Sequence, residues 1–361
     1  MDTVRASAPQ LDGLVPYDPK YLPAEAFLSA NENPCDVDAE IRAEIAAEIA
    51  RVALNRYPDP LANDLRELIA EANGLTRDWV LVGNGGDELL FNLALAWGGP
   101  GRKFLNVPPT FSVYAANARL TGTEVVNVAR LANYAIDEEA VIERAAQGDI
   151  EFVVITSPNN PTGENASEDF LVRLLDSTDA LVMVDEAYFE FSGQTMVPYL
   201  GKHKNLVILR TFSKAYSLAG VRMGYIMAHP DVIREFIKVR QPYSVDAVSQ
   251  AIARVVYANR AKFEPGIEAI VSERGRVMDA LAAIDGVTPY PSDANYILFT
   301  LEGAAEAWEY LYARGILVRD FSKSAGLEGS LRVTIGTKDQ NNAFLSVLGE
   351  FVSQAADSAA S

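Results

Sequence analysis

Residues 211–225 of the chain read TFSKAYSLAGVRMGY, and they begin where the β-rich run Leu206–Thr211 ends. A lysine just past a buried strand lies at the carboxyl edge of a sheet, where α/β folds bind ligands. Desolvation there favours the neutral amine of Lys214, which can attack an aldehyde. Ser213 adds a hydroxyl beside it, and Arg222 adds a guanidinium that suits a phosphate group. The stretch therefore predicts an α/β fold, and it leaves two interpretations of Lys214: a solvated surface lysine or a reactive amine at the edge of the sheet.

Strands and helices are expected to alternate on the N-terminal side of this stretch. The β-rich runs lie at 79–82, 103–107, 152–156, 181–185 and 206–211. Helical patterns lie at 39–54, 87–97 and 111–120. Short apolar runs of this kind fill a sheet that is buried on both faces. The alternation indicates a large α/β domain built on a mostly parallel sheet.

The pattern changes beyond about residue 250. A long helical stretch at 251–283 is followed by separated strands at 295–300, 316–319 and 331–335. A terminal helix then begins at the segment TKDQ, 337–340, which has the spacing of a capping box. We therefore expect an N-terminal arm at 1–30, a large domain at 31–250 and a smaller α+β domain at 251–361. The arm is expected to pack with the small domain or with a partner subunit.

The composition limits the classes of function. The 361 residues include 31 Lys and Arg against 49 Asp and Glu, a formal net charge of -18 that repels nucleic acid and anionic membranes. The apolar stretches are too short to span a bilayer, and no secretory signal opens the chain. The single cysteine, Cys35, excludes an internal disulfide, and the two histidines have no metal-like neighbours. We expect a cytoplasmic protein without a metal site, a nucleic-acid partner or a membrane partner.

A second chemical feature lies at the end of the run 181–185. Asp185 ends this run, and Tyr188 follows three residues later. The two residues place an acid and a nearby phenol at the carboxyl edge of the sheet, where they could serve catalysis. The alternative is an aspartate that caps a turn, as Asp commonly does. The reactive Lys214 downstream favours the catalytic interpretation.

Two turns supply further polar groups. The segment GNGGDE, 83–88, lies between a strand and a helix. Its glycines let backbone amides approach a phosphate, and the helix N-terminus favours an anion there. The segment SPNNPTG, 157–163, predicts a tight turn, because Pro, Asn and Gly each favour turn geometry.

Taken together, these motifs resemble those of the fold type I aminotransferases, and the match runs through nearly the whole chain. The family pattern Ser-Lys, a short spacer and Gly-x-Arg-x-Gly-Tyr is present in full at 213–225, and Asn-Pro-Thr-Gly at 160–163. The resemblance implies a large domain with a mostly parallel, seven-stranded sheet flanked by helices, and a smaller α+β domain. It also implies pyridoxal 5'-phosphate as the cofactor, held by Lys214 as a Schiff base.

The same resemblance implies roles for other residues. Asp185 would pair with the pyridine nitrogen, and Tyr188 and Asn160 would hydrogen-bond the ring oxygen. Phe111 would stack on the ring, although relatives often carry Tyr at this position. Tyr57 would reach the cofactor of the other subunit in a homodimer. The residues implied to bind the cofactor phosphate are Gly85, Gly86, Asp87, Ser213, Arg222 and Tyr57.

A narrower resemblance concerns the substrate. The segments LVPY at 14–17, SANENP at 29–34, RYP at 56–58 and GILVRD at 315–320 are similar to those of the histidinol-phosphate aminotransferases, apart from Ser-Ala before Asn31. It implies that Arg332 grips the α-carboxylate of an amino or keto acid, with the bidentate geometry that favours Arg over Lys. Tyr17 and Arg319 would contact the phosphate end of the substrate, and Asn31 would line the site.

The implied reaction exchanges an amino group between histidinol phosphate and 2-oxoglutarate, which yields imidazole acetol phosphate and glutamate in histidine biosynthesis. These motifs do not separate it from an aromatic amino-acid aminotransferase. A phosphothreonine-type decarboxylase is an alternative from another reaction class, because it too pairs a substrate phosphate with this scaffold. A non-catalytic regulator is disfavoured because the whole catalytic set is present. The main amine donor therefore stays open.

Overall fold

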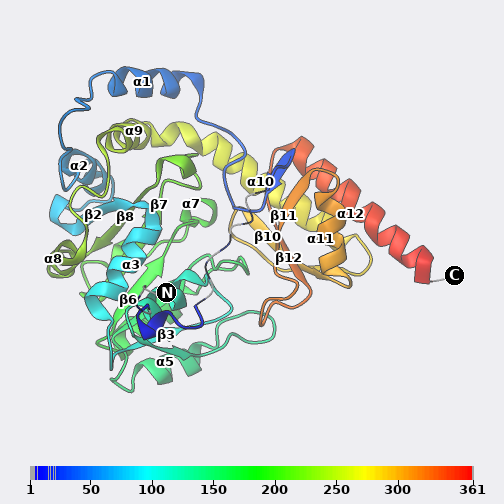
Figure 1. The fold of residues 1–361 in the computed structure, drawn as a ribbon, viewed down its shortest axis with the longest axis horizontal. Coiled ribbons are helices and arrows are strands. Elements are labelled where there is room, and N and C mark those ends of the chain that lie inside the picture. Colours follow the sequence, from blue (N-terminus) through cyan, green and yellow to red (C-terminus); the bar gives the residue numbers. More distant parts are fainter. Residues whose placement is uncertain are drawn as a thin grey trace.

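The computed structural model describes residues 5, 7–14, 16, 18, 20 and 22–359, and it contains two sheets (Figure 1). The larger sheet has seven strands in the order β2-β8-β7-β6-β5-β3-β4. Only β8 runs antiparallel to its neighbours β2 and β7; the other neighbouring pairs are parallel. The strands are β2 (Val80–Asn84), β3 (Lys103–Asn106), β4 (Glu124–Asn127), β5 (Phe152–Thr156), β6 (Leu181–Asp185), β7 (Leu206–Thr211) and β8 (Met223–Ala228). The predicted α/β class with a mostly parallel sheet is confirmed.

Helices cover both faces of this sheet because its strands are apolar on both sides. Alternate residues of one strand enter different cores: Val182 and Val184 face one, Leu181 and Met183 the other. Helices α3, α4 and α8 cover the second core. Helices α2, α5, α6 and α9 cover the first. Their bounds are α2 (Asn63–Ala72), α3 (Gly85–Trp97), α4 (Val113–Leu120), α5 (Glu138–Ala145), α6 (Glu168–Ser177), α8 (Pro230–Val239) and α9 (Ala247–Ala258).

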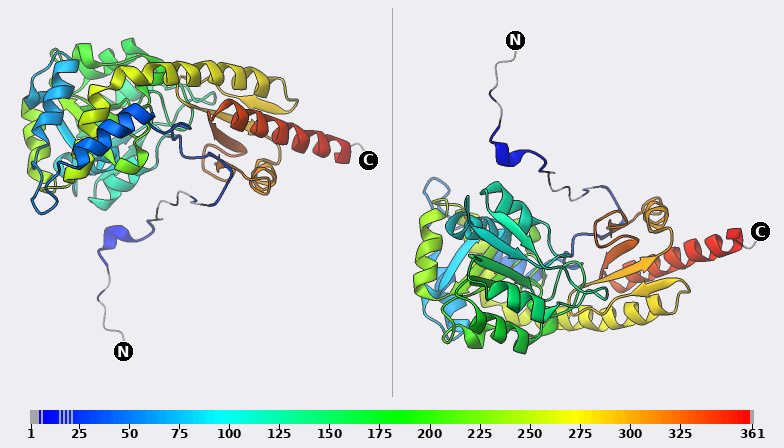
Figure 2. Two further views of the ribbon diagram at one scale, coloured as in Figure 1. Left: turned by 90° about the horizontal axis from the view of Figure 1, so that it is seen from above. Right: turned by 90° about the horizontal axis from the view of Figure 1, so that it is seen from below.

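The smaller sheet has five strands in the order β1-β11-β12-β10-β9. Helices α10, α11 and α12 bury its core, in which Tyr296, Phe299 and Phe344 are fully buried. Figure 2 shows α10 and α12 running side by side. The bounds are β1 (Ala26–Leu28), β9 (Val287–Pro289), β10 (Tyr296–Leu301), β11 (Ile316–Asp320), β12 (Ser330–Thr334), α10 (Glu264–Ala282), α11 (Ala304–Tyr312) and α12 (Lys338–Ala359). These elements match the α+β texture expected beyond residue 250.

The capping box before α12 is confirmed in both directions. The Thr337 amide donates to Gln340 Oε1 at 3.0 Å, and the Gln340 amide donates to Thr337 Oγ1 at 3.3 Å. Each side chain thereby satisfies a backbone N–H that the first turn of a helix leaves without a partner.

Two helix predictions were wrong. The single long helix at 251–283 is two helices, α9 and α10, separated by the 3-10 turn Arg260–Phe263. Pro265 lies at the start of α10, where its missing N–H does no harm, whereas inside a continuous helix it would remove a hydrogen bond. Helix α1 (Ala39–Ile49) ends five residues before the expected Leu54, and turns follow it. A 3-10 turn also occurs at Arg77–Trp79, and short helical turns at Phe189–Ser192 (α7), Val197–Tyr199 and Ala219–Val221.

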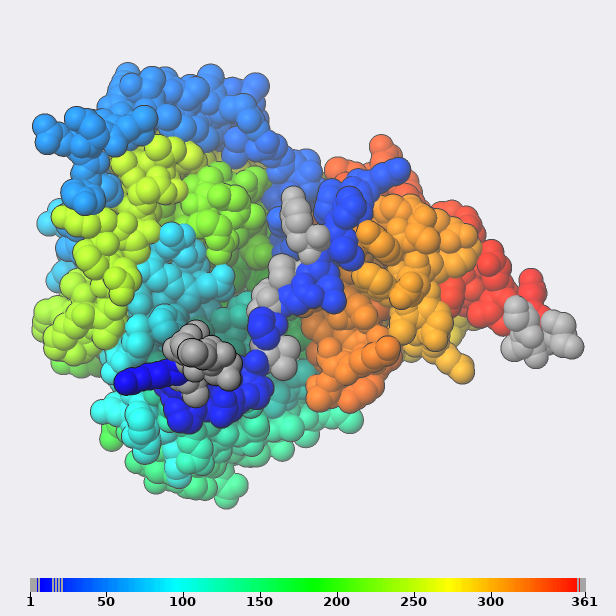
Figure 3. All heavy atoms as spheres, viewed as in Figure 1, coloured from blue at the N-terminus to red at the C-terminus, as the bar shows by residue number. Residues whose placement is uncertain are grey.

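The described part of the N-terminal arm touches both the large body, which is the seven-stranded sheet with its helices, and the small body, which is the five-stranded sheet with α10, α11 and α12. Residues 9–11 form a 3-10 turn that lies against α4, and β1 pairs in parallel with β11 of the smaller sheet. Figure 3 shows the blue atoms of the arm passing over the large body toward the smaller sheet. Helix α9 spans residue 250 and packs on α1 and α2. The domain boundaries at 30 and 250 stay predictions. Among the described residues, no helix could cross a membrane.

Candidate active site

Most of the predicted site residues meet at one edge of the larger sheet. Lys214 follows β7, Asp185 ends β6 and the turn with Asn160 follows β5, so all three leave parallel strands at the carboxyl edge. Arg222 reaches the same edge from the opposite direction, because it directly precedes the antiparallel strand β8. The smaller sheet contributes Arg332 from β12, and the result is a site between the two sheets.

Lys214 is held against the segment that leads from β1 to α1. Its Nζ donates to the carbonyl of Ala30 at 2.8 Å and lies 5.8 Å from the ring centre of Tyr188. Burial, and secondarily the charge of Arg332, lowers the pKa of the Lys214 amine to about 8. A larger share of the amine is therefore neutral near pH 7 than for an ordinary lysine, as a nucleophile requires.

Asp185 is buried, with 5% of its surface exposed, and its carboxylate accepts hydrogen bonds from two donors. The Ala187 amide donates to Oδ1 at 3.0 Å, and the Tyr114 hydroxyl donates to Oδ2 at 2.6 Å. Burial raises the pKa of Asp185 to about 6, and both donors act in the opposite direction. A carboxylate with this environment can hold the proton of a ring nitrogen that is placed beside it.

Asn31 connects the smaller sheet to Tyr188. Its backbone has φ 56°, and its amide N donates to Thr334 Oγ1 at 3.0 Å. Asn295 Nδ2 donates to the carbonyl of Asn31 at 3.0 Å. Asn31 Nδ2 then donates to the hydroxyl of Tyr188 at 3.0 Å. The left-handed backbone, which Asn tolerates better than most residues, directs this side chain toward the site.

Two arginines face each other across neighbouring strands of the smaller sheet. Arg319 and Arg332 are partners in the β11–β12 register, and both guanidinium groups lie near the ring of Phe321, at 5.8 and 5.6 Å from its centre. Arg332 donates to Asn160 Oδ1 and to the carbonyl of Ser29. Like charges directly opposite each other on a sheet are destabilising, so this pair suits an anionic ligand.

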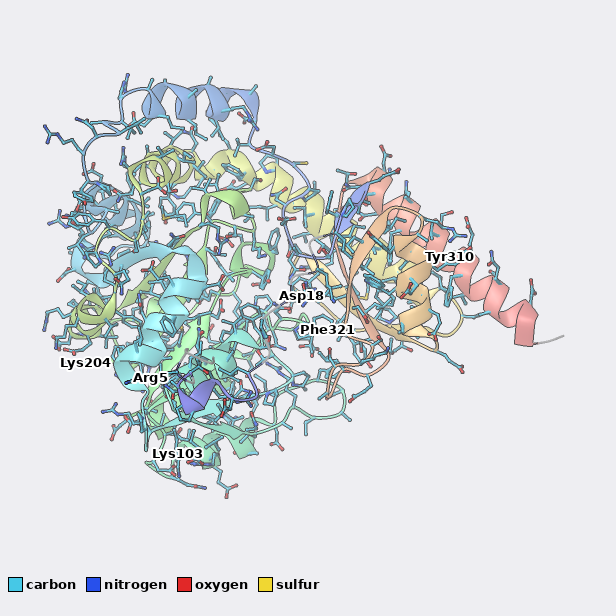
Figure 4. The ribbon with its side chains drawn as sticks, in the orientation of Figure 1. Arg5, Asp18, Lys103, Lys204, Tyr310 and Phe321 are labelled. Carbon is cyan, nitrogen blue, oxygen red and sulfur yellow. The ribbon has the colours of Figure 1, made fainter. Side chains whose placement is uncertain are left out.

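Arg319 also binds the N-terminal arm. Its Nη1 donates to the carbonyl of Asp18 at 3.1 Å. Figure 4 labels Asp18 and Phe321, which lie close together where the arm passes between the two bodies. Tyr17, the neighbouring predicted substrate residue, lies outside the described residues.

The predicted phosphate site is a close contact between two glycine segments and Arg222. A Cβ on Gly85 would lie 2.7 Å from Arg222 Nη2, and a Cβ on Gly224 would lie 2.8 Å from the Gly86 amide N. Arg222 Nη2 donates to Asp87 Oδ2 at 3.1 Å. Only glycine permits this approach of backbone amides, guanidinium and the N-terminus of α3.

Ser213 and Phe111 are two further residues of the predicted cofactor site. The Ser213 hydroxyl is buried and accepts from Thr211 Oγ1 at 3.0 Å. The ring of Phe111 packs edge-on against Tyr114, with centres 5.5 Å apart. The cradle of amides, the guanidinium, an amine with a lowered pKa and a buried carboxylate fit a phosphorylated pyridine aldehyde, so these residues are suited to pyridoxal phosphate. Among the described residues, no cluster of side chains could hold a metal ion.

Tyr57 differs from the other predicted residues. It is 82% exposed, and its ring is stacked on that of Tyr243 with centres 4.6 Å apart. Its described ring contact is thus with another surface residue and not with the predicted site residues near Lys214.

The sequence analysis missed the residues behind Asp185. Tyr114 and Thr156 are both buried, and the Tyr114 hydroxyl lies 2.8 Å from Thr156 Oγ1. One signal was available for Tyr114: it follows Phe111 by three residues, a spacing that puts two residues on the same side of a helix. Thr156 carried none, because only the strand register brings it beside Asp185.

The comparisons with known proteins agree with this geometry. The model of the family "Aminotransferase class I and II" matches residues 26–348. The chain is 40% identical over 340 residues to histidinol-phosphate aminotransferase 1 of Carboxydothermus hydrogenoformans, which covers 94% of this chain and 96% of the relative.

Two solved structures have the same fold. The histidinol-phosphate aminotransferase of Sinorhizobium meliloti in complex with pyridoxal-5'-phosphate matches with a TM-score of 0.88 at 21% identity, over 98% of this chain and 99% of that one. The L-threonine-O-3-phosphate decarboxylase of Porphyromonas gingivalis matches with a TM-score of 0.80 at 27% identity, over 90% and 99%. The chain therefore belongs to the aminotransferase class I and II family, among the histidinol-phosphate aminotransferases.

Proposed function

We propose that this chain uses pyridoxal phosphate to exchange an amino group between histidinol phosphate and 2-oxoglutarate, forming imidazole acetol phosphate and glutamate in histidine biosynthesis. The observation that carries the proposal is the pair Arg319 and Arg332, which are opposite each other on β11 and β12 and share the ring of Phe321. A site with two such cations suits two anionic substrates, one with a phosphate and one with carboxylates.

Lys214 is the residue that moves the proton. When bound, pyridoxal phosphate supplies an aldehyde that takes up the substrate amine and a ring that accepts electrons. Lys214 would hold the cofactor through its amine, and the same amine would act as the general base for the proton on the substrate α-carbon. Burial lowers the pKa of this amine to about 8. This value is close to the pH at which an enzyme works, and general-base catalysis is most efficient when the two are similar.

The other residues orient the cofactor. Asp185 holds the proton of the ring nitrogen, and Tyr188 and Asn160 donate to the ring oxygen. Phe111 packs against the ring. The residues that bind the phosphate within one chain are Gly85, Gly86, Asp87, Ser213 and Arg222. Their shared position at the carboxyl edge of the larger sheet supports these roles.

The substrates divide between the two arginines. Arg332 binds the α-carboxylate of glutamate or 2-oxoglutarate. Arg319 and Tyr17 bind the phosphate of histidinol phosphate, which has no carboxylate, and Asn31 lines the substrate site. The net charge of -18 supports this role of Arg319, because a negatively charged protein repels a phosphate unless a positively charged side chain binds it.

The half-reaction of the holoenzyme tests this assignment. We expect histidinol phosphate and glutamate to convert the bound cofactor to its amine form quickly, and phenylalanine slowly, as followed by absorbance. Arg319→Ala should raise the concentration of histidinol phosphate needed for half the maximal rate by about 10- to 100-fold, since a charge-assisted hydrogen bond is lost. Glutamate should be affected much less. Arg314→Ala, which removes an exposed arginine that lies over Tyr310, is the control.

Three results would contradict parts of the proposal. Fast conversion by phenylalanine with none by histidinol phosphate would make the enzyme an aromatic amino-acid aminotransferase. Release of carbon dioxide without a keto acid would identify a decarboxylase. Equal losses for both substrates in Arg319→Ala would remove Arg319 from the phosphate site.

The proposal includes a cytoplasmic homodimer with shared sites. Tyr57 is exposed in one chain and stacks on the exposed Tyr243, which supports a role for Tyr57 in the cofactor site of a partner subunit. Each site of a two-fold dimer would then combine Lys214 of one subunit with Tyr57 of the other.

Mixed dimers test this sharing. Lys214→Ala and Tyr57→Ala chains, each impaired alone, should regain up to about a quarter of wild-type activity after mixing, because one site of every mixed dimer is intact under two-fold symmetry. The measurement is activity after subunit exchange. If Tyr57 served the site of its own chain, both sites of the mixed dimer would be defective and no activity would return.

A further inference from the structure

A set of buried hydroxyl groups behind Asp185 has no role in the proposed function. The Tyr114 hydroxyl lies 2.6 Å from Asp185 Oδ2 and 2.8 Å from Thr156 Oγ1. Thr156 is the register partner of Asp185 on the neighbouring strand. Tyr114, Thr156 and Asp185 are each at most 5% exposed, so water does not satisfy these groups.

The side-chain amide of Asn159 determines where the proton of Thr110 goes. Asn159 Nδ2 donates to the carbonyl of Pro109 at 3.1 Å and to Thr162 Oγ1 at 2.7 Å. Both amide protons of Asn159 are therefore used, and its Oδ1 is the acceptor. Thr110 Oγ1 donates to this oxygen at 2.8 Å. Since a hydroxyl has one proton, Thr110 has none left for Thr156.

The proton of Thr156 goes to Tyr114. Thr156 Oγ1 is 3.3 Å from Thr110 Oγ1 but only 2.8 Å from the oxygen of Tyr114, whose own proton is donated to Asp185. Tyr114 then accepts from Thr156 and has its own proton directed at Asp185. The fold thus supplies a fixed donor to one carboxylate oxygen, while the Ala187 amide donates to the other.

Apart from these two hydrogen-bond donors, the environment of Asp185 disfavours the ionised carboxylate. Burial raises its pKa, and the nearby carboxylates of Asp87 and Glu186 act in the same direction. The hydrogen bond from Tyr114 is the largest influence that lowers it. Tyr296 of β10 also faces Asp185, and its own hydroxyl donates to the carbonyl of Asn159 at 2.7 Å.

We infer that Tyr114, with Thr156 behind it, is a positioning residue that keeps Asp185 ionised and oriented toward the cofactor ring nitrogen. The inference rests on the proposed function for the meaning of that ionisation, but the hydrogen bonds exist in the protein without cofactor. Tyr114 acts through Asp185 and does not itself touch the substrate. Its ring also supports Phe111, so only a substitution that keeps the ring isolates the hydroxyl.

The first experiment uses cofactor-free protein, with Tyr114→Phe as the variant. Infrared absorbance of the protonated carboxyl group is measured as a function of pH. The band of Asp185 is identified as the one that is missing in Asp185→Asn. The wild-type midpoint should lie near pH 6, and in Tyr114→Phe it should rise by about one pH unit or more, because a hydrogen bond to the charged form is lost. Tyr257→Phe, which removes another buried tyrosine hydroxyl, should leave the midpoint unchanged.

The second experiment uses the holoenzyme. Tyr114→Phe should lower kcat by about tenfold with KM within about twofold, and should move the acidic limb of the pH profile upward by about one unit. Thr156→Val should shift both titrations in the same direction by less. Thr156→Ser, which keeps the hydroxyl, should restore wild-type behaviour.

An unchanged infrared midpoint in both Tyr114→Phe and Thr156→Val would overturn the inference, whatever their activity. If Tyr114→Phe does not fold, the Thr156 pair decides. Failure of the proposed function is a different observation: the wild-type protein would show no amino transfer while the midpoint still responded to Tyr114.

Discussion

Lys214→Ala is expected to lower kcat by about 10⁴-fold, the largest loss among the substitutions that the structure suggests. In the proposed mechanism the amine supplies both the covalent attachment of the cofactor and the base that takes the α-proton, so alanine would remove two functions. Absorbance of the reconstituted protein should lack the band of the lysine-bound cofactor. The fold should be unaffected, because the side chain makes one hydrogen bond, to the carbonyl of Ala30.

Two controls separate this loss from a general effect. Lys204→Ala removes a lysine that is 77% exposed on the surface of the large body and should retain full activity (Figure 4). Small primary amines added to Lys214→Ala should restore part of the proton transfer, because the cavity left by the side chain admits them. Wild-type turnover by Lys214→Ala would contradict the assignment of Lys214.

Asp185→Asn is expected to lower kcat by about 10³-fold with a smaller change in KM. The neutral amide cannot hold a proton on the ring nitrogen, and the electron-accepting capacity of the ring falls. The half-reaction with glutamate, followed by absorbance, measures this loss. Asp285→Asn, the same chemical change at an exposed turn, is the control and should have no effect.

The same substitution should not destabilise the cofactor-free protein at pH 8. The folded-state pKa of Asp185, about 6, lies above the usual value of 3.8, so the folded protein binds the proton more tightly than the unfolded chain. Stability is therefore lost as the pH rises from about 4 to 6, and the full cost, about 3 kcal/mol, is present above that range. Thermal unfolding at pH 8 should give Asp185→Asn a Tm equal to or above that of wild type. A clearly lower Tm would show that the carboxylate is needed for folding.

The strands that carry the predicted site residues were predictable, because their signal is local. The strands 152–156, 181–185 and 206–211 have the predicted bounds, because continuous apolar runs between turns report burial on both faces directly. The residues at their ends then fall at one edge by the geometry of a parallel sheet. This is why Asp185 and Lys214 could be related from the sequence although 29 positions separate them.

Helix limits were less predictable where two influences competed. Residues 251–283 are helix-forming almost throughout, and Pro265, followed by Gly266, is the strongest local signal against a single helix. The fold resolves the conflict by packing α9 on the large body and α10 on the smaller sheet, with the break between them. Local propensity alone contains no information about which body a helix joins.

The sequence by itself determined the α/β class and the positions of Lys214, Asp185 and the glycine segments at strand ends and turns, because these depend on side-chain periodicity and on turns within a few residues. The cofactor roles of these residues rest on the family resemblance and stay predictions. The tertiary structure decided which distant side chains meet. The pairing of Arg319 with Arg332 depends on the register of β11 and β12, and the donor to Asp185 depends on how α4 packs on β5 and β6. Register and packing arise from contacts between segments far apart in the chain, and local patterns do not encode them.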